Sequence, residues 1–167
     1  MTDWDKRFIN LASYIALWSK DPGTKCGAVI VRPDRTIASM GFNGFPQRVA
    51  DVKLDDRGYK LERVIHAEMN AVLFLRERPS GGYTLYTWPM LPCNRCAVHV
   101  IQAGIARVVA PLYKGERWAP AIKITKELLN EAQLQILEIG TDGVVDAPLI
   151  NNGARGMSST GTLIDGT

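Results

Sequence analysis

The stretch YTLYTWPMLPCNRCAVHVIQAGIARVVAP, residues 83–111, contains the pattern that decides the fold. Its first residues, 83–88, are aromatic and apolar and predict a strand, which a proline-bounded loop follows. Residues 93–103 predict a helix that ends at Gly104, and 105–111 predict a second strand. A strand, a helix and a strand in this order are typical of layered domains in which helices pack on a sheet.

The same alternation continues on both sides of this stretch. We expect a helix over 4–19, a hairpin of strands near 26–32 and 36–42, a helix from about 64 to 77, a helix over 119–131 and a strand over 134–139. A long polar loop runs from Gly41 to about Glu62. These elements predict an α/β fold with a mixed sheet in one domain over 1–147. Residues 148–167 are rich in Gly, Ser, Thr and Asn and predict a poorly packed tail.

The composition is that of a soluble globular protein, since 46% of the 167 residues are hydrophobic and 22% are charged. The longest apolar runs, such as Ala28-Val29-Ile30-Val31, are far shorter than the roughly 20 residues of a membrane span. No apolar signal core follows the N-terminus, and the net charge of +3 is too small for a dedicated nucleic-acid binder. We therefore expect a cytoplasmic protein that binds neither membranes nor nucleic acid.

Three side chains in two short motifs have the spacing of metal ligands. Cys93 and Cys96 are three residues apart, which places both thiols on one face of a helix start, and His66 is the potential third ligand. Positive partial charge at a helix N-terminus favours the thiolate form that zinc requires. Zinc with three protein ligands keeps a fourth position open, so the sequence predicts a catalytic rather than a structural zinc.

Other interpretations of these residues stay open. A Cys-x-x-Cys pair also occurs in structural zinc knuckles and redox pairs, and His99, one turn after Cys96, is a competing third ligand. Cys26 has no ligand spacing to the other cysteines and precedes an apolar segment, so we interpret it as a buried strand cysteine. Glu68, two residues after His66, is a carboxylate that the zinc does not need and that is available for proton transfer.

Several stretches of the chain resemble the cytidine and deoxycytidylate deaminase superfamily, and most closely its deoxycytidylate deaminase branch. They are residues 18–22, 26–31, 41–46, 66–71, 85–87, 92–97 and 101–109. His-x-Glu followed by Pro-Cys-x-x-Cys is the signature of the zinc-dependent nucleobase deaminases. The Gly-Phe-Asn-Gly-Phe-Pro loop at 41–46 and the context of Asn70 resemble the deoxycytidylate branch.

The resemblance implies a three-layer cytidine deaminase-like fold, with a five-stranded mixed sheet flanked by helices. It implies hydrolytic deamination of dCMP to dUMP, the precursor for thymidylate synthesis. In that reaction Glu68 would be the catalytic proton shuttle, and the zinc ligands would be His66, Cys93 and Cys96. The resemblance also implies a homo-oligomer, often a hexamer, which dCTP activates and dTTP inhibits at a separate site.

The resemblance also assigns residues to the substrate site. Asn43 is placed against the deoxyribose hydroxyl, although Asn before Gly is also ordinary turn chemistry, and Ala67 is placed beside the substrate. Trp118 either helps to close a loop over the substrate or anchors the next helix. The cations available for the substrate phosphate are Arg95, Lys114 and Arg117.

The effector site is a weaker part of the resemblance. The loops that resemble allosteric elements contain Lys20, Lys25, Asn43, Gly44 and Arg48. Each of the charged residues, taken singly, is better interpreted as a solvated surface charge than as an effector contact. Residues 44–65 contain no Cys or His, so the second, structural zinc of some family members is not expected and we predict one Zn²⁺ per chain. Residues 88–91 form a bulkier lead into the cysteine motif than is common in the superfamily, so base contacts from this loop are not transferred.

Alternative functions of two kinds stay open at this point. The chain could deaminate another substrate, such as dCTP, cytidine or a tRNA adenosine, although the modest positive charge favours a tRNA partner poorly. It could also be a non-catalytic, zinc-stabilised nucleotide-binding module. Glu68 argues against a module of that kind, because a sensor has no need of a proton shuttle.

Overall fold

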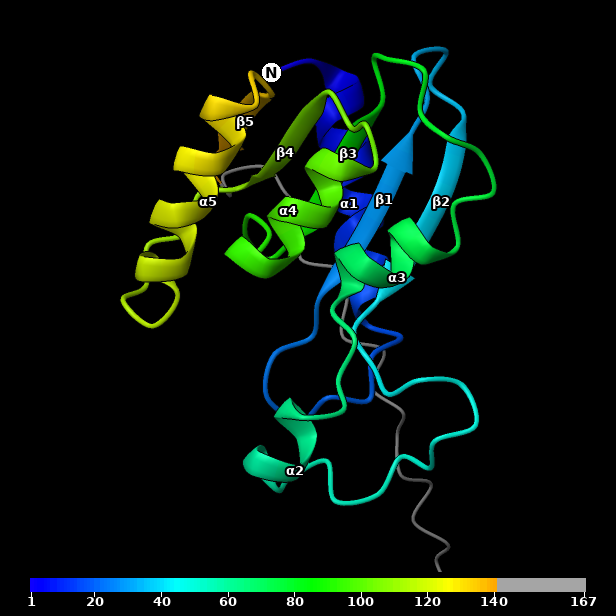
Figure 1. Cartoon of the computed structure of the whole chain (residues 1–167), viewed down its shortest axis with the longest axis vertical. Helices are drawn as coiled ribbons and strands as arrows, with labels where there is room; N and C mark the ends of the chain where they lie inside the picture. The colour runs from blue at the N-terminus through cyan, green and yellow to red at the C-terminus, as the bar shows by residue number, and fades with distance from the viewer. Residues whose placement is uncertain (141–167) are drawn as a thin grey trace, which may run out of the picture.

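The computed structural model describes residues 1–140, which form a five-stranded sheet with helices packed against it (Figure 1). The helices are α1 (Asp3–Ala16), α2 (Arg57–Leu61), α3 (Ala67–Leu73), α4 (Asn94–Gln102) and α5 (Ala119–Glu131). The strands are β1 (Gly27–Val31), β2 (Ile37–Phe42), β3 (Thr84–Trp88), β4 (Arg107–Pro111) and β5 (Gln135–Ile139). The predicted domain boundary at residue 147 and the tail at 148–167 lie outside the described residues. Among residues 1–140, no helix has both the length and the hydropathy that a membrane span requires.

The sheet is mixed and has the strand order β2-β1-β3-β4-β5. Strand β1 pairs antiparallel with β2 and with β3, whereas β3, β4 and β5 run parallel to one another. The parallel strands are joined through α4 and α5, because parallel neighbours need a crossover connection rather than a tight turn. The predicted mixed, five-stranded α/β sheet is confirmed.

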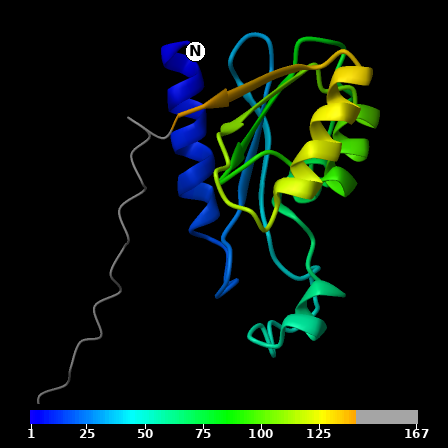
Figure 2. The same ribbon diagram turned by 90° about the vertical axis from the view of Figure 1, so that its left-hand side faces the viewer.

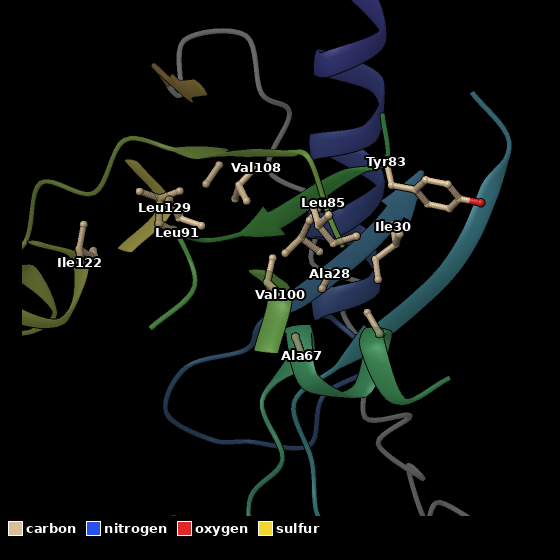
Figure 3. Packing of buried hydrophobic residues seen from close by; sticks show 13 residues of the cluster. Ala28, Ile30, Ala67, Tyr83, Leu85, Leu91, Val100, Val108, Ile122 and Leu129 are labelled. Carbon is tan, nitrogen blue, oxygen red and sulfur yellow. The ribbon is translucent and has the colours of Figure 1, made fainter. Parts of the chain in front are cut away.

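The sheet is covered on both faces, which gives three layers. Helix α1 packs on one face, and α3, α4 and α5 pack on the other (Figure 2). Strand β1 is buried along its whole length, with Val29 and Val31 in the cluster under α1 and Ala28 and Ile30 in the opposite cluster (Figure 3). Burial on both faces explains why this strand is a continuous apolar run rather than an alternating one.

Two glycines let helices approach the β1–β2 hairpin closely. A Cβ atom at Gly27 would collide with the carbonyl oxygen of Ala12 in α1, and one at Gly41 would collide with the carbonyl oxygen of Ala67 in α3. Any side chain at these positions would push the helix away from the sheet. Because Ala67 is the first residue of α3, the contact at Gly41 fixes the position of this helix start.

A buried carboxylate attaches α1 to the middle of the sheet. Asp5 is 1% exposed, and its two oxygens accept hydrogen bonds from the Arg107 guanidinium at 2.7 and 3.1 Å. The Tyr86 hydroxyl donates to the same carboxylate at 2.9 Å, and Thr2 and Asp5 form a capping box at the start of α1. Burial alone would raise the pKa of Asp5, but the hydrogen bonds from Arg107, Thr2 and Tyr86 hold this pKa well below its usual range.

The structure differs from the sequence-based expectation between 43 and 77. The helix expected from about 64 to 77 is the shorter α3, and α2 lies inside the stretch that we expected to be a loop. Residues 45–64, which we call the flap, leave the body of the domain after Gly44 and return at Ile65. These two residues form a β-bridge with N–H to O=C distances of 3.1 and 2.8 Å. Figure 1 shows α2 well away from the sheet, and none of its residues is buried.

Candidate active site

The three predicted metal ligands meet at the starts of two neighbouring helices. His66 is the N-cap residue of α3, Cys93 is the N-cap residue of α4, and Cys96 is the third residue of α4. Neither N-cap side chain makes a capping hydrogen bond to its own helix, so both are free to face the space between the helices. The Nδ1 atom of His66 lies 3.4 Å from the Sγ atom of each cysteine, and one ligand atom from each residue lies within 4.8 Å of the others.

These distances fit a tetrahedral zinc ion. Zinc–sulfur bonds of about 2.3 Å and zinc–nitrogen bonds of about 2.0 Å separate the two kinds of ligand atom by about 3.5 Å. The thiol electrostatics point the same way. A hydrogen bond with Cys96 lowers the pKa of the Cys93 thiol, whereas the same contact and burial raise the pKa of Cys96. A divalent cation in this position would stabilise both thiolates.

Glu68 lies beside the ligand cluster without being part of it. It is the second residue of α3, is 8% exposed, and lines a cavity together with His66 and Cys93. Burial raises the pKa of this carboxyl above its usual range. A carboxyl group that can hold a proton next to a metal site has the properties of a general acid and base.

The cavity has a volume of about 200 Å³ and extends from the ligand cluster to the flap. Most of its lining comes from four segments: the turn before β1, the flap, the loop after β3 and the segment before α5. The lining residues are Asp21, Gly23, Thr24, Cys26, Asn43, Arg57, Lys60, Leu61, Val64, His66, Glu68, Trp88, Pro89, Met90, Leu91, Cys93, Arg117 and Trp118. Cys26, which we expected to be a buried strand residue, is therefore a partly buried wall residue just before β1.

Asn43 lines the cavity, and three hydrogen bonds attach its side chain to the cavity wall. Its Oδ1 atom accepts a hydrogen bond from the backbone N–H of Cys26 at 2.7 Å. Its Nδ2 atom donates to the carbonyl oxygen of Thr24 at 2.9 Å and to Asp21 at 3.3 Å. It follows β2 directly and is 5% exposed, so the alternative of an ordinary turn residue does not describe its position.

The predicted phosphate cations separate into two groups. Arg117 lines the cavity, and its guanidinium lies 4.9 Å from the centre of the Trp118 ring, which lines the cavity too. Arg95 on α4 and Lys114 after β4 are exposed and do not line it. Ala67 is fully buried under the hairpin and is not a lining residue either.

Sequence reasoning missed two cations of the flap, Arg57 and Lys60, which line the cavity. They stand in a polar stretch without apolar periodicity, so nothing in the pattern distinguished them from solvated charges. One usable signal was Asp56, whose side chain caps α2 by accepting a hydrogen bond from the Tyr59 N–H at 3.0 Å. An Asp at that spacing from a basic pair could have indicated a short helix.

The predicted effector residues do not gather in one cavity. Lys20 forms an exposed ion pair with Asp51 of the flap at 2.6 Å, and Lys25 and Arg48 are exposed. Gly44 lines a second, apolar hollow beside β2 and α3, whereas Asn43 faces the first cavity.

Two further alternatives can be compared with the structure. His99 is exposed on α4, where its Nδ1 atom lies 2.7 Å from the Arg95 carbonyl oxygen, and the ligand cluster within residues 1–140 does not include it. Trp118 is partly buried and packs against the core, which agrees with an anchor for α5, and it also lines the cavity; its closing of a loop over the substrate stays a prediction.

The sequence of the chain is similar to those of known deaminases. Residues 2–112 match the family described as the cytidine and deoxycytidylate deaminase zinc-binding region. An uncharacterized deaminase from Aliivibrio fischeri is 36% identical over 146 residues, which cover 85% of this chain and 97% of that protein. A probable deoxycytidylate deaminase from Caenorhabditis elegans is 37% identical over 139 residues, which cover 80% of this chain and 68% of that protein.

The fold has a counterpart among solved structures. A dCMP deaminase from the cyanophage S-TIM5, solved in complex with dCMP and dUMP, superimposes with a TM-score of 0.67. The match covers 83% of this chain and 99% of that chain at 24% identity, so it supports the fold alone. The three-layer cytidine deaminase-like arrangement expected from the sequence is confirmed. His66, Cys93 and Cys96 are the candidate zinc site of this arrangement.

Proposed function

The chain belongs to the cytidine and deoxycytidylate deaminase family, and we propose that it is a zinc-dependent hydrolase that converts dCMP and water to dUMP and ammonia. The observation that carries the proposal is Glu68, a buried carboxyl beside the ligand cluster and inside a cavity that also contains cationic side chains. A module that only bound nucleotides would have no use for a buried carboxyl at this position. A relative of the chain from Caenorhabditis elegans is named probable deoxycytidylate deaminase and one from human is named deoxycytidylate deaminase, which supports dCMP as the substrate.

The reaction needs one nucleophile and the delivery of two protons to the substrate. Zinc held by His66, Cys93 and Cys96 would lower the pKa of water to about 7, so that its proton can be removed at neutral pH. Glu68 takes a proton from the attacking water and delivers it to N3 of the pyrimidine ring as the oxygen adds to C4. It then carries the second proton to the amino group, the C4–N4 bond breaks, and the group leaves as ammonia. Both water protons are accounted for, one on N3 of dUMP and one in ammonia.

The cavity wall suits a nucleotide at the sugar position as well. The Oδ1 atom of Asn43 accepts one hydrogen bond from the protein, and a carbonyl oxygen can accept two. We assign the remaining acceptor position to a hydroxyl of the deoxyribose. The three hydrogen bonds of this side chain hold the oxygen in place before the substrate arrives, which reduces the entropy lost on binding.

The proposal extends to assembly and regulation. We infer a cytoplasmic homo-oligomer, a hexamer, that dCTP activates and dTTP inhibits and that supplies dUMP for thymidylate synthesis. Support for the assembly comes from apolar side chains around the second hollow, which are exposed in the isolated chain. These are Trp18, Met40, Leu73 and Phe74, with exposed fractions of 50%, 42%, 62% and 55%. Subunit contacts commonly cover apolar surface of this kind.

The test is ammonia release by the zinc-loaded protein with dCMP, dCTP, cytidine and a tRNA anticodon stem, each with and without dCTP or dTTP as effector. We expect selective turnover of dCMP, raised by dCTP and suppressed by dTTP. Selective turnover of a different substrate would support the zinc-dependent deamination but refute dCMP as the substrate. A zinc-loaded protein that binds nucleotides but releases no ammonia from any of them would refute the enzyme and favour the binding module.

A further inference from the structure

The flap side of the cavity contains an arginine, Arg57, that has no ion-pair partner among residues 1–140. Arg57 lines the cavity from α2 and is exposed, and within residues 1–140 no carboxylate forms an ion pair with it and no acceptor receives its hydrogen bonds. A guanidinium has five N–H donors in a planar fork, the geometry that binds phosphate oxygens in pairs. Because none of the residues of α2 is buried, the side chain is not needed to pack a core.

Arg117 faces the same cavity from the segment before α5. Its guanidinium lies over the Trp118 ring, 4.9 Å from the centroid. A cation–π contact uses none of the N–H donors in hydrogen bonding, and no hydrogen bond from Arg117 is formed within residues 1–140, so these donors stay available. No ion pair involves Arg117 within the described part of the chain, so two arginines from separate segments of the fold line one cavity without a carboxylate partner.

The third cation of the cavity has a different role. Lys60 donates to Asp21 at 2.7 Å, and the two side chains are only 15% and 9% exposed. Asp21 also accepts hydrogen bonds from the backbone N–H groups of Gly23 at 2.7 Å and Thr24 at 3.3 Å. The charge of Lys60 therefore neutralises the Asp21 carboxylate, which would otherwise repel an anionic ligand. The same pair fastens α2 to the turn before β1, one helical turn from Arg57.

We propose that Arg57 and Arg117 form a phosphate subsite that binds the 5′-monophosphate of the substrate and selects a nucleotide over its nucleoside. This inference rests on the proposed deamination of dCMP and adds the residues that recognise its anionic group. Two guanidinium charges match the double negative charge of a monophosphate, while the Lys60–Asp21 pair contributes no net charge. Lys60 acts as a positioning residue, because it holds the helix that presents Arg57.

The test compares the zinc-loaded full-length chain with its Arg57→Ala, Arg57→Lys, Arg117→Ala and double Arg57→Ala/Arg117→Ala variants. The value of kcat/KM is measured for dCMP and for deoxycytidine. Loss of one charge-assisted contact to phosphate should lower kcat/KM for dCMP by about 10- to 100-fold and leave deoxycytidine within about twofold. Arg57→Lys should recover part of the loss, and the double variant should no longer prefer dCMP. Arg78→Ala, an exposed arginine outside the cavity, is the matched control.

Binding of dUMP by titration calorimetry separates this subsite from the proposed function. If the wild-type protein binds dUMP but releases no ammonia from dCMP, the enzyme fails and the subsite is judged on dUMP affinity, which Arg57→Ala should weaken by the same 10- to 100-fold. An equal loss for dCMP and deoxycytidine, or no loss for either, would overturn the subsite. Absence of dUMP binding by the wild-type protein would overturn both. Zinc content and thermal unfolding of each variant exclude loss of the fold as the cause.

Discussion

The two sides of the cavity are built in opposite ways. The ligand side consists of the starts of α3 and α4, which are packed on the sheet through fully buried residues such as Ala67 and Val100 (Figure 3). The flap side consists of α2 without a buried residue, held by the Gly44–Ile65 bridge and the Lys60–Asp21 pair. The difference teaches that the groups proposed to break the bond lie where packing fixes them, while a polar insertion carries a group that we propose to contact the anionic end of the substrate.

The largest expected effect comes from the ligand side. Glu68→Gln removes the proton shuttle and keeps the size of the side chain, so kcat for dCMP should fall by about 10²- to 10⁴-fold. Zinc content, measured by metal analysis, should stay at the wild-type value, because Glu68 is not in the ligand cluster. Substantial residual turnover would contradict the shuttle, and loss of zinc would show that the carboxyl has a structural role instead.

The second-largest effect tests the packing of α1 on the face of the sheet opposite α3 and α4. Asp5→Asn breaks the paired hydrogen bonds from Arg107 to a nearly inaccessible carboxylate, so the free energy of unfolding should fall by about 3 kcal/mol. Urea unfolding at neutral pH measures the loss. KM for dCMP of the folded fraction should stay unchanged, because Asp5 belongs to α1, which packs on the face of the sheet opposite α3 and α4. A large change in KM with little loss of stability would show that Asp5 supports the active site rather than the packing of α1 on the sheet.

A smaller effect is expected when the flap is loosened. Lys60→Met removes the tie to Asp21 and leaves a buried carboxylate without its cation, so KM for dCMP should rise about tenfold, equivalent to about 1.4 kcal/mol. The free energy of unfolding should also fall, by about 1–3 kcal/mol, because the buried Asp21 carboxylate loses its cation, although α2 itself contributes nothing to the core. Lys123→Met on the exposed surface of α5 is the control. A fall in kcat at constant KM would mean that the flap takes part in the chemistry.

The smallest expected effect is the loss of stability at acidic pH. Burial would raise the pKa of Asp5 and of Asp21, but hydrogen bonds outweigh it and leave both below their usual values. A carboxyl whose folded pKa lies below its unfolded value of about 3.9 stabilises the fold above that pH, and the stabilisation is lost as pH falls towards the folded pKa. The free energy of unfolding should therefore drop by about 1 kcal/mol or more between pH 5 and pH 3. Asp5→Asn should drop less; an identical drop in this variant would exclude Asp5 as the cause.

The ligand side could be predicted from the sequence because its chemistry is local. Each motif, His66 to Glu68 and Cys93 to Cys96, spans one helix start, and the apolar alternation of strands and helices brings the two starts to one place. The helix that carries Glu68 was expected to be longer than α3, and His66 was expected in its first turn rather than at its N-cap. Such errors are common at helix ends, where capping rather than propensity decides the boundary.

The flap side could not be predicted in the same way. Arg57 and Lys60 stand among many exposed charges, and only the fold shows that they reach a cavity whose other wall is formed by residues far along the chain. Arg95 and Lys114 are equally good cations by sequence and lie elsewhere on the surface. Patterns of apolar residues specify which side chains are inside, but they carry no information about which surface charge faces a ligand.

The measurement that tests the central claim most directly is a structure of the zinc-loaded Glu68→Gln protein with dCMP bound. The account predicts the amino group of the cytosine ring beside the metal held by His66, Cys93 and Cys96, and the phosphate between Arg57 and Arg117. A nucleotide bound in the reverse direction, or bound outside this cavity, would contradict the division of chemistry and recognition between the two sides.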